Sequence, residues 1–496
     1  MQLEFKSTPL TYLNSRLRQV QNQEQTLELR LTEGMPDIGR ILLTGGQARL
    51  SSKQWRADSV SISGGIQAWA LYLPEDGSQP QLVEGWIPLQ AKFPLPEGCR
   101  EGILDGRITV RNLDGRALSP RKLLLRCSAA VVAEALCPEE TAIYTPEEVP
   151  EGVHILCNSY PVRLCREAGE KVFSLEDTLY ADGMMPARLL YCRLMPKITE
   201  QAVTGNRLMM RGMVSVGYLG EDAEGKLSGG NLELPFAQLV ELEGEYDKEA
   251  TAGVNLSLAS CDWQMEGEGL RVRCEIIAQY RIHGGCLVKL AEDAYSSTME
   301  LEPQLEMPEL PILLESRREE AEIFRTIQVP AMQVMDVAFL PDEPLSYREG
   351  DQLVAELPGQ IQMLYLDERQ SLQAVAEAWC YRWELPAGDS CGLRLCAVPD
   401  GMPRIHTQGD QVRLECDLML EAETWTRQKM PMLTMLQLGK IKEPDPCRPS
   451  VILRRAEQNT LWELAKSNGS TVEAIRQANQ LTGEPDPKHM LLIPVL

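Results

Sequence analysis

The segment WALYLPEDG, residues 69–77, joins apolar residues and a Tyr-Leu pair to an acidic turn, and it has two counterparts further along the chain. These are SVGYLGEDAEG at 215–225 and QMLYLDERQ at 362–370. Self-similarity at a fixed period indicates repeated copies of one structural unit. The tyrosines that mark this unit lie 146 and 147 residues apart: Tyr72, Tyr218 and Tyr365.

Two further landmarks repeat with nearly the same period. Cys127 in LLLRCSAAVV, Cys274 in LRVRCEIIAQY and Cys416 in VRLECDLMLEA are separated by 147 and 142 residues. GMPDIGRILL and GMMPARLLYC place Arg40 and Arg188 148 residues apart. Three independent landmarks at one period predict three tandem modules.

Each copy carries the pattern of antiparallel hairpins. RITVRN, residues 107–112, alternates apolar and polar residues and leads through a turn-rich segment into a second alternating run. We therefore predict mostly antiparallel β-sandwich modules with a few short helices at their edges. We expect the repeated tyrosines to be core residues, because an aromatic side chain packs well on a half-buried strand.

The chain changes character after EPDPCRP, residues 443–449, whose three prolines indicate a linker. In TLWELAKSNGSTVEAIRQANQL, Thr460 and Glu463 have capping-box spacing, and Asn468-Gly469 tolerates the left-handed backbone that ends a helix. The flanking segments VILRRA and MLLIPV are typical of strands.

A second helix is expected to begin at Ser470, because Ser470 and Glu473 repeat the capping-box spacing. Two helices this short are marginal alone, so they must pack on the flanking strands. The fold prediction is mainly β, with three tandem β-sandwich-like modules and a small C-terminal βααβ cassette. The predicted boundaries are 1–149, 150–312 and 313–442 for the modules, 443–449 for the linker and 450–496 for the cassette.

Bulk composition limits the partners. The 496 residues carry a formal net charge of −23, which opposes binding to the phosphates of nucleic acids. The opening MQLEFKSTPLTYL lacks the basic-then-apolar order of a secretory signal, and no long apolar run predicts membrane insertion. We therefore expect a cytosolic protein, in which the 14 cysteines, lacking zinc spacing, are buried reduced thiols.

The cassette resembles a LysM domain. The positions that carry the resemblance are Thr460, Leu461, Trp462, Ala465, Ile475, Asn479, Leu491, Ile493 and Pro494. The three modules resemble the SPOCS modules of spore-forming Firmicutes, for which PDIGRILL, residues 36–43, is characteristic. SPOCS modules followed by a LysM-like domain resemble the SipL-like spore coat morphogenetic proteins of clostridia.

This resemblance implies a non-enzymatic scaffold in the mother-cell cytoplasm that tethers the coat at the forespore surface. The implied partners are spore coat proteins, above all a SpoIVA-type coat ATPase, and self-assembly stays open. A cell-wall protein that binds peptidoglycan or another GlcNAc glycan is the alternative. Glycan-binding LysM domains carry Gly-Asp where this chain has Gln458 and Asn459, and Gly-Gln where it has Lys488 and His489, which favours a protein partner.

The residue-level expectations follow from this match. The predicted binding loops contain Gln458, Asn459, Thr460, Asn479, Lys488 and His489, and the predicted cassette core contains Leu461, Trp462, Ile475 and Ile493.

No catalytic residue, metal site or cofactor is predicted. GEDAEGKLS, from Gly220, imitates a phosphate-binding loop, but Leu227 stands where a Ser or Thr should bind Mg²⁺, and the segment belongs to a hairpin turn. The four histidines are isolated in sequence. The acidic LESRREEAEIF, residues 314–324, is expected to be a solvated connector.

Overall fold

The computed structural model describes residues 2–181, 183, 185–443, 447–457, 459–483 and 485–495. These residues form antiparallel sheets throughout, and their only helices are the two of the C-terminal cassette. The predicted mainly β fold class is confirmed, whereas the short helices expected at the module edges do not occur in the described residues. No helix among them is long and apolar enough to cross a membrane.

Each module consists of two sheets. One sheet is formed by the first, last and penultimate strands of the module, and the other by its middle strands. The first module contains β2 (Phe5–Arg30), β7 (Lys122–Pro146) and β6 (Ile103–Ser119) in one sheet and β3 (Ile38–Trp55), β4 (Ser59–Pro74) and β5 (Gln81–Pro94) in the other. Every strand pair within these sheets is antiparallel: β3–β4, β4–β5 and β6–β7 are consecutive hairpins, and β2 and β7 pair although they are the first and last strands of the module.

The second and third modules repeat this plan. The second contains β8 (Val153–Leu179), β12 (Gly269–Ser296) and β11 (Thr251–Glu266), with β9 (Arg188–Glu221) and β10 (Leu227–Tyr246) in its other sheet. The third contains β14 (Glu309–Gln328), β20 (Gln411–Lys429) and β19 (Gly392–Gln408), with β15 (Gln333–Pro341), β16 (Leu345–Glu349), β17 (Gln352–Leu366) and β18 (Leu372–Pro386).

The long strand β9 folds back on itself. Gly205 has a φ of +59°, in the left-handed region, and a methyl group added at Gly220 would lie 2.6 Å from the carbonyl oxygen of Arg188. The two halves of β9 therefore run side by side and correspond to β3 and β4 of the first module.

The repeated landmarks lie in the module cores, as predicted. Tyr72, Tyr218 and Tyr365 are at most 7% exposed. The landmark cysteines Cys127, Cys274 and Cys416 are buried in the same three clusters, which combine residues of both sheets. The repeat in the sequence therefore reflects the same buried positions in the sandwich core of each module.

The three modules pack against one another rather than forming a string. One shared core takes three residues from each: Leu43, Trp69 and Leu71, then Leu190, Tyr191 and Leu219, then Met335, Leu364 and Leu372. The two landmark arginines lie at these interfaces, because Arg40 donates to the carbonyl oxygen of Leu372 at 2.9 Å and Arg188 to that of Pro80 at 3.2 Å. Each arginine thus reaches from its own module into a neighbouring one.

A buried ionic network occupies the centre of this arrangement. Glu134, Arg281 and Glu423 each follow the landmark cysteine of their module by seven residues. Glu134 accepts from Arg281 at 2.7 Å and also from Arg394, which in turn donates to Glu423 at 2.5 Å. Equivalent positions of the repeat therefore carry opposite charges that meet between modules.

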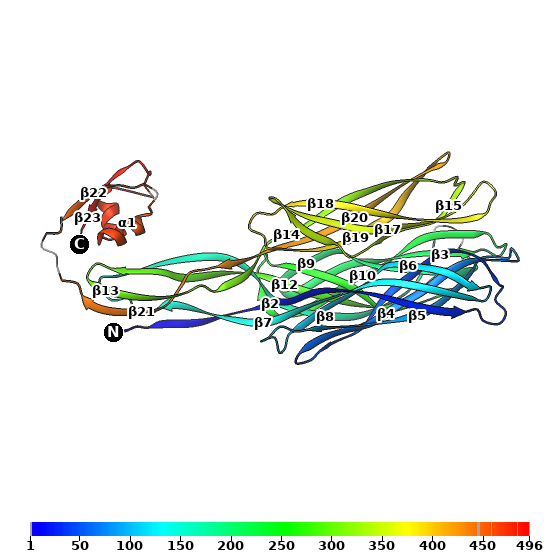
Figure 1. Cartoon of the computed structure of the whole chain (residues 1–496), viewed down its shortest axis with the longest axis horizontal. Coiled ribbons are helices and arrows are strands. Elements are labelled where there is room, and N and C mark those ends of the chain that lie inside the picture. The colour runs from blue at the N-terminus through cyan, green and yellow to red at the C-terminus, as the bar shows by residue number, and fades with distance from the viewer. Residues whose placement is uncertain are drawn as a thin grey trace.

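A stalk of paired strands projects from this body (Figure 1). It contains β1 (Gln2–Leu3), β13 (Met299–Glu306) and β21 (Met432–Ile441), together with the outer ends of the longest module strands. Its apolar core again combines the three modules through Tyr12, Ile143, Leu164, Leu290, Ile312 and Met432. Since β1 pairs with β21, the start of the chain lies beside the end of the third module.

The cassette lies at the tip of the stalk (Figure 1). It consists of β22 (Val451–Arg455), α1 (Leu461–Asn468), α2 (Val472–Asn479) and β23 (Met490–Pro494), with β22 antiparallel to β23. The capping box of Thr460 and Glu463 is present, and Gly469 ends α1 with a φ of +61°. The cap of α2 was predicted one residue too early, because Thr471 rather than Ser470 accepts from the backbone N–H of Ala474.

Two other expectations are corrected, whereas the prediction that the phosphate-loop imitation is a hairpin turn is confirmed. LESRREEAEIF belongs to strand β14, paired along its length with β20, so it is no connector and the boundary at 313 falls inside a strand. Cys99 and Cys137 form a disulfide, and Cys157, Cys380 and Cys391 are exposed, so the cysteines are not uniformly buried thiols. The phosphate-loop imitation is a hairpin turn in which Asp222 accepts from the N–H groups of Glu224 and Lys226.

Candidate functional site

The cassette is the candidate functional site, and its hydrophobic core holds it together. Leu461, Ile475 and Ile493 are at most 1% exposed and pack with Leu464 and Leu491. Burying one such side chain contributes roughly 1.5–3 kcal/mol, so a few of them stabilise a domain of this size. Three of the four predicted core residues, Leu461, Ile475 and Ile493, therefore lie where the helices meet the two strands, whereas the fourth, Trp462, is only partly buried at the edge of this core.

The two predicted binding loops lie side by side. The N–H of Ala456 donates to the carbonyl oxygen of His489 at 2.9 Å, and that of Glu457 to the carbonyl oxygen of Pro487 at 2.8 Å. These bonds bring Thr460, Lys488 and His489 to one exposed surface, with Asn459 partly buried beside them. The remaining loop residue, Gln458, lies outside the described residues.

Asn479 has an internal role. Its amide nitrogen donates to the carbonyl oxygens of Ile475 and Leu492, at 2.8 and 2.6 Å, and its side-chain oxygen accepts from the N–H of Leu492 at 2.8 Å. These three bonds fasten the end of α2 to β23. Both amide hydrogens are used within the cassette, so Asn479 positions the loop and has no donor left for a ligand.

Trp462 lies between the cassette and the stalk. Its indole N–H donates to the Asp293 carboxylate at 2.8 Å, and its ring meets Tyr295 edge-on at a centroid distance of 4.8 Å. Lys466 pairs with the same carboxylate at 2.7 Å. The indole ring is therefore occupied by contacts within the chain.

Tyr295 completes this docking contact. It is buried in the cassette's own core cluster, although it belongs to β12 of the second module, and its hydroxyl donates to the carbonyl oxygen of Ser470 at 3.0 Å. Burial raises the pKa of Tyr295 to about 12, so it stays a neutral donor. The cassette thus follows the third module in the chain but docks on the second.

The outer face of the cassette sheet is apolar and exposed. Val451 and Leu453 on β22 are 50% and 61% exposed, and Met490 and Leu492 on β23 are 46% and 45% exposed. Leu453 and Leu492 are directly opposite each other in the antiparallel register, while the intervening Leu491 points into the core. Four neighbouring apolar side chains on so small a domain mark a contact surface.

Sequence reasoning missed part of this site. The alternation in VILRR and MLLIP indicates which side chains share the outer face, once the strands are paired. No local signal indicates Asp293 or Tyr295, because they follow no motif and contact residues about 170 positions later in the chain.

No family model matches the chain, and no match was found among curated proteins or solved structures. The described residues contain no group of three His, Cys, Asp or Glu side chains placed to hold a metal ion. The candidate binding surfaces of the cassette are therefore its loops and the outer face of its sheet.

Proposed function

We propose that this protein is a non-enzymatic scaffold of endospore coat assembly, which tethers the coat layer at the forespore surface through protein contacts of its LysM-like cassette. The observation that carries the proposal is the placement of the cassette at the tip of a long stalk, with its apolar outer sheet face turned to solvent. The stalk extends this face away from the body. The sporulation context is carried by the SPOCS resemblance.

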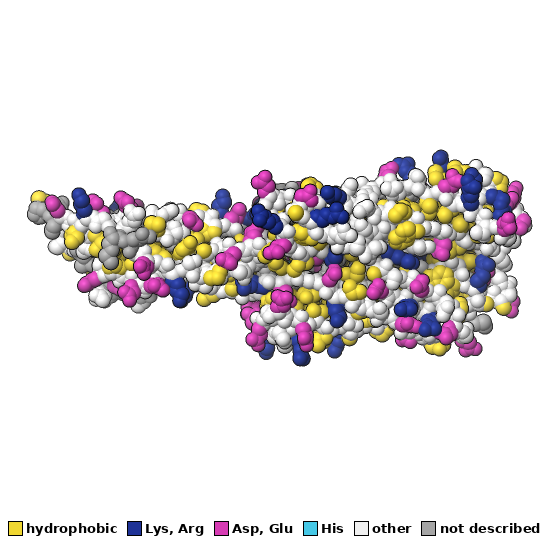
Figure 2. All heavy atoms as spheres, turned by 90° about the horizontal axis from the view of Figure 1, so that it is seen from below, with side chains coloured by type: hydrophobic (Ala, Val, Ile, Leu, Met, Phe, Trp, Pro, Cys, Tyr) yellow, Lys and Arg dark blue, Asp and Glu magenta, His cyan; other side chains and the backbone are white. Residues whose placement is uncertain are grey.

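The charge distribution supports a protein partner. Within 449–496 the cassette has five basic and five acidic residues, so the net charge of −23 belongs to the rest of the chain. Figure 2 shows acidic and basic side chains mixed over the visible face of the body, with no large patch of one sign. A neutral cassette on an extended stalk can approach partners that an acidic body repels.

The glycan alternative is weakened by the contacts of Trp462. An aromatic ring that stacks on a sugar needs a free face, whereas this indole is bonded to Asp293 and packed on Tyr295. The loops also lack the Gly-Asp pair that lets the backbone approach an acetamido sugar. We therefore assign the contact to a coat protein, with the SpoIVA-type ATPase as the first candidate.

Localisation in sporulating cells tests the proposal. A fluorescent fusion of the full chain is expected to form a shell around the forespore in the mother cell, and a version ending at Pro446 is expected to be diffuse. Uniform fluorescence from the full chain would overturn the coat assignment. A shell that persists after truncation would overturn the role of the cassette.

A pull-down with the purified SpoIVA-type ATPase distinguishes whether the outer sheet face or the loops of the cassette bind the partner. Leu453→Glu and Leu492→Glu are expected to weaken binding at least tenfold, about 1.4 kcal/mol, without unfolding the cassette, because both side chains are already exposed. Leu118→Glu, which alters an equally exposed leucine on the body, is the matched control. Loss of binding in Lys488→Glu instead would move the contact to the loops, and binding to GlcNAc oligomers would favour the glycan function.

A further inference from the structure

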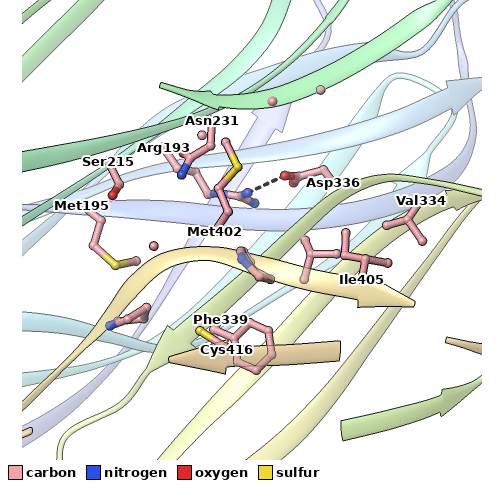
Figure 3. A pocket seen from close by; sticks show the side chains of 18 of the residues that line it. Arg193, Met195, Ser215, Asn231, Val334, Asp336, Phe339, Met402, Ile405 and Cys416 are labelled. Carbon is pink, nitrogen blue, oxygen red and sulfur yellow. Dashed lines mark hydrogen bonds and ion pairs between the residues drawn. The ribbon is translucent and has the colours of Figure 1, made fainter. Parts of the chain in front are cut away.

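A groove with a cavity volume of about 240 Å³ lies between the second and third modules (Figure 3). One wall is formed by β9 and β10, including Gly229, Gly230 and Asn231, and the other by β15. The β19 segment that contains Met402 and Ile405 covers the groove. In Figure 1, β15 lies at the opposite end of the molecule from the cassette, so this groove is independent of the docking site.

The groove runs along a sheet edge. Six consecutive residues of β15, 334–339, line it. Successive side chains of a strand point to opposite faces, so a run of consecutive lining residues means that the backbone edge of the strand faces the groove. Among the strands that the structure describes, β15 pairs with β17 alone and β10 with β9 alone, so each presents an unpaired edge to the groove.

The two edges approach each other at one end. A methyl group at Gly229 would collide with the carbonyl oxygen of Met335, so the backbones of β10 and β15 touch there. The six lining residues of β15 span about 20 Å at roughly 3.4 Å per residue. The groove is therefore long enough to hold several residues of an extended chain.

Among the described strands, the third module has a larger bulge, which shapes the cover of the groove. The pairing of β19 with β20 jumps from Asp400 to Arg404, leaving three residues unpaired, whereas the corresponding shifts in β6 and β11 each skip one residue. Gly401 in this bulge has a φ of +75°. Bulges near binding sites re-aim side chains, and this one places Met402 over the groove.

The groove carries one unpaired donor in otherwise neutral surroundings. Of the described residues that line it, Arg193 and Asp336 alone are charged, and they pair at 2.7 Å, while Tyr191 donates to the other Asp336 oxygen at 2.5 Å. The second terminal nitrogen of Arg193, Nη1, is buried and has no hydrogen-bond partner among the described residues. A buried donor without an acceptor costs about 1–3 kcal/mol, which a ligand carbonyl would recover.

We propose that this groove binds an extended, uncharged apolar peptide segment of a partner protein, which adds as a strand to the free edge of β15. The backbone of the peptide pairs with 336–339, beyond the contact between β10 and β15, one of its carbonyl oxygens accepts from Arg193 Nη1, and its apolar side chains contact Met195, Phe339 and Met402. A charged segment is not expected to bind, because Arg193 and Asp336 already neutralise each other. A further charge in the groove would lose its hydration without gaining a partner.

A library of random dodecapeptides displayed on phage and panned on the full-length protein tests the proposal. The selected peptides are expected to lack charge and to alternate apolar residues, and a fluorescein-labelled copy gives the affinity by anisotropy. Met402→Glu is expected to weaken binding at least tenfold, about 1.4 kcal/mol, because it brings a carboxylate to the groove from a side chain that is already exposed. Leu345→Glu, on exposed β16 of the same module, is expected to leave the affinity unchanged.

A pair of glycine variants tests the groove more finely. A methyl group at Gly217 would lie 3.4 Å from Arg193 Nη2 and 3.6 Å from the Asn231 side-chain oxygen, so Gly217→Ala fits the fold but fills the space beside the guanidinium. Gly285→Ala is the matched control in the same module, because a methyl group there would meet a side-chain oxygen of Asp247 at 3.8 Å. Only Gly217→Ala is expected to weaken binding.

Hydrogen exchange distinguishes strand addition from side-chain binding. The bound peptide is expected to slow exchange of the amides within 336–339. Failure to select any uncharged peptide, equal affinity for Met402→Glu and the unaltered protein, or an unprotected β15 would each overturn the proposal. None of these outcomes bears on the cassette.

Discussion

Single buried charges determine how the modules of this protein recognise one another. Glu134, Arg281 and Arg394 are each at most 16% exposed in their side chains, and each comes from a different module. Taking such groups out of water is unfavourable unless every one of them has a partner. The network therefore disfavours any module order or register that leaves a guanidinium or carboxylate unpaired.

We predict that Glu134→Gln destabilises the folded protein by about 3–5 kcal/mol, because it removes the negative charge shared by two buried guanidinium groups. The measurement is the free energy of unfolding in urea. Glu24→Gln is the control, since Glu24 and its partner Arg126 are both 63% exposed, and it is expected to change stability by less than about 0.5 kcal/mol. Equal effects of the two substitutions would contradict a structural role for the network.

We predict that stability falls as the pH is lowered from 6.5 towards 4. Burial, opposed by Glu423, lowers the pKa of His283 from 6.5 to about 4, so in this window the unfolded chain takes up a proton that the folded chain does not. The Arg394 and Arg281 guanidinium groups lower the pKa of the buried Glu423 carboxyl to about 2, so a further loss of stability follows as the pH falls from 4.5 towards 2.

Urea titrations at pH 7, 6 and 5 check this prediction. One fully shifted proton contributes a slope of about 1.4 kcal/mol per pH unit. His283→Gln, which cannot take up that proton, is expected to show the shallower dependence. Parallel curves for the two proteins would contradict the assignment to His283.

Elements that are distant in sequence meet at the cassette. Helix α1 contacts the end of β12 through Trp462 and Lys466, and the turn after α1 contacts it through Ser470, although the linker follows the third module in the chain. Just before the linker, the Lys442 ammonium donates to the carbonyl oxygen of Ser296 at 2.7 Å, and near the end of the linker Arg448 donates to that of Asn468 at 3.0 Å. Both ends of the linker are thus fastened, and the docking contact sets the orientation of the cassette.

We predict that Asp293→Ala releases the cassette from the stalk without unfolding it, because the carboxylate is the common acceptor of Trp462 and Lys466 and lies outside the cassette core. Hydrogen exchange is expected to accelerate in β12 around Tyr295 and in 461–470, while β23 stays protected. Glu176→Ala, which removes an exposed ion pair with Arg271 in the same module, is the control. Unchanged exchange at Tyr295 would show that the remaining contacts suffice for docking.

The whole molecule is one cooperative body carrying a small appended domain. The shared cores at the module interfaces and in the stalk take residues from all three modules, so no module keeps its apolar surface covered alone. The cassette has its own core, to which the body contributes Tyr295. We therefore expect the three modules to depend on one another for folding, and the body to fold without the cassette.

We predict that deleting the third module, residues 309–429, prevents the first two from folding stably, whereas ending the chain at Pro446 leaves the body intact. Differential scanning calorimetry is expected to show one major transition for the full chain, at nearly the same temperature after removal of the cassette. A two-module protein that unfolds cooperatively at an unchanged temperature would contradict the shared-core description.

The sequence by itself determined the repeat, the β architecture and the caps of α1. Alternation, turn residues and capping spacing act between neighbours in the chain, and the 146-residue period reports the same buried tyrosine in each core. Most of β14 escaped detection because the residues between Leu314 and Ile323 are largely charged, so the apolar alternation that marks a strand is interrupted there.

Only the tertiary structure decided how the modules pack, where the cassette docks and which groove stays open. Each depends on residues more than a hundred positions apart: Glu134 with Arg281 and Arg394, Trp462 with Asp293, and β10 with β15. A local pattern states which face of an element is apolar, but not which distant element covers it. The distant partner is determined by the packing of all three modules together, because one arrangement has to pair the buried charges and cover the apolar faces at the same time.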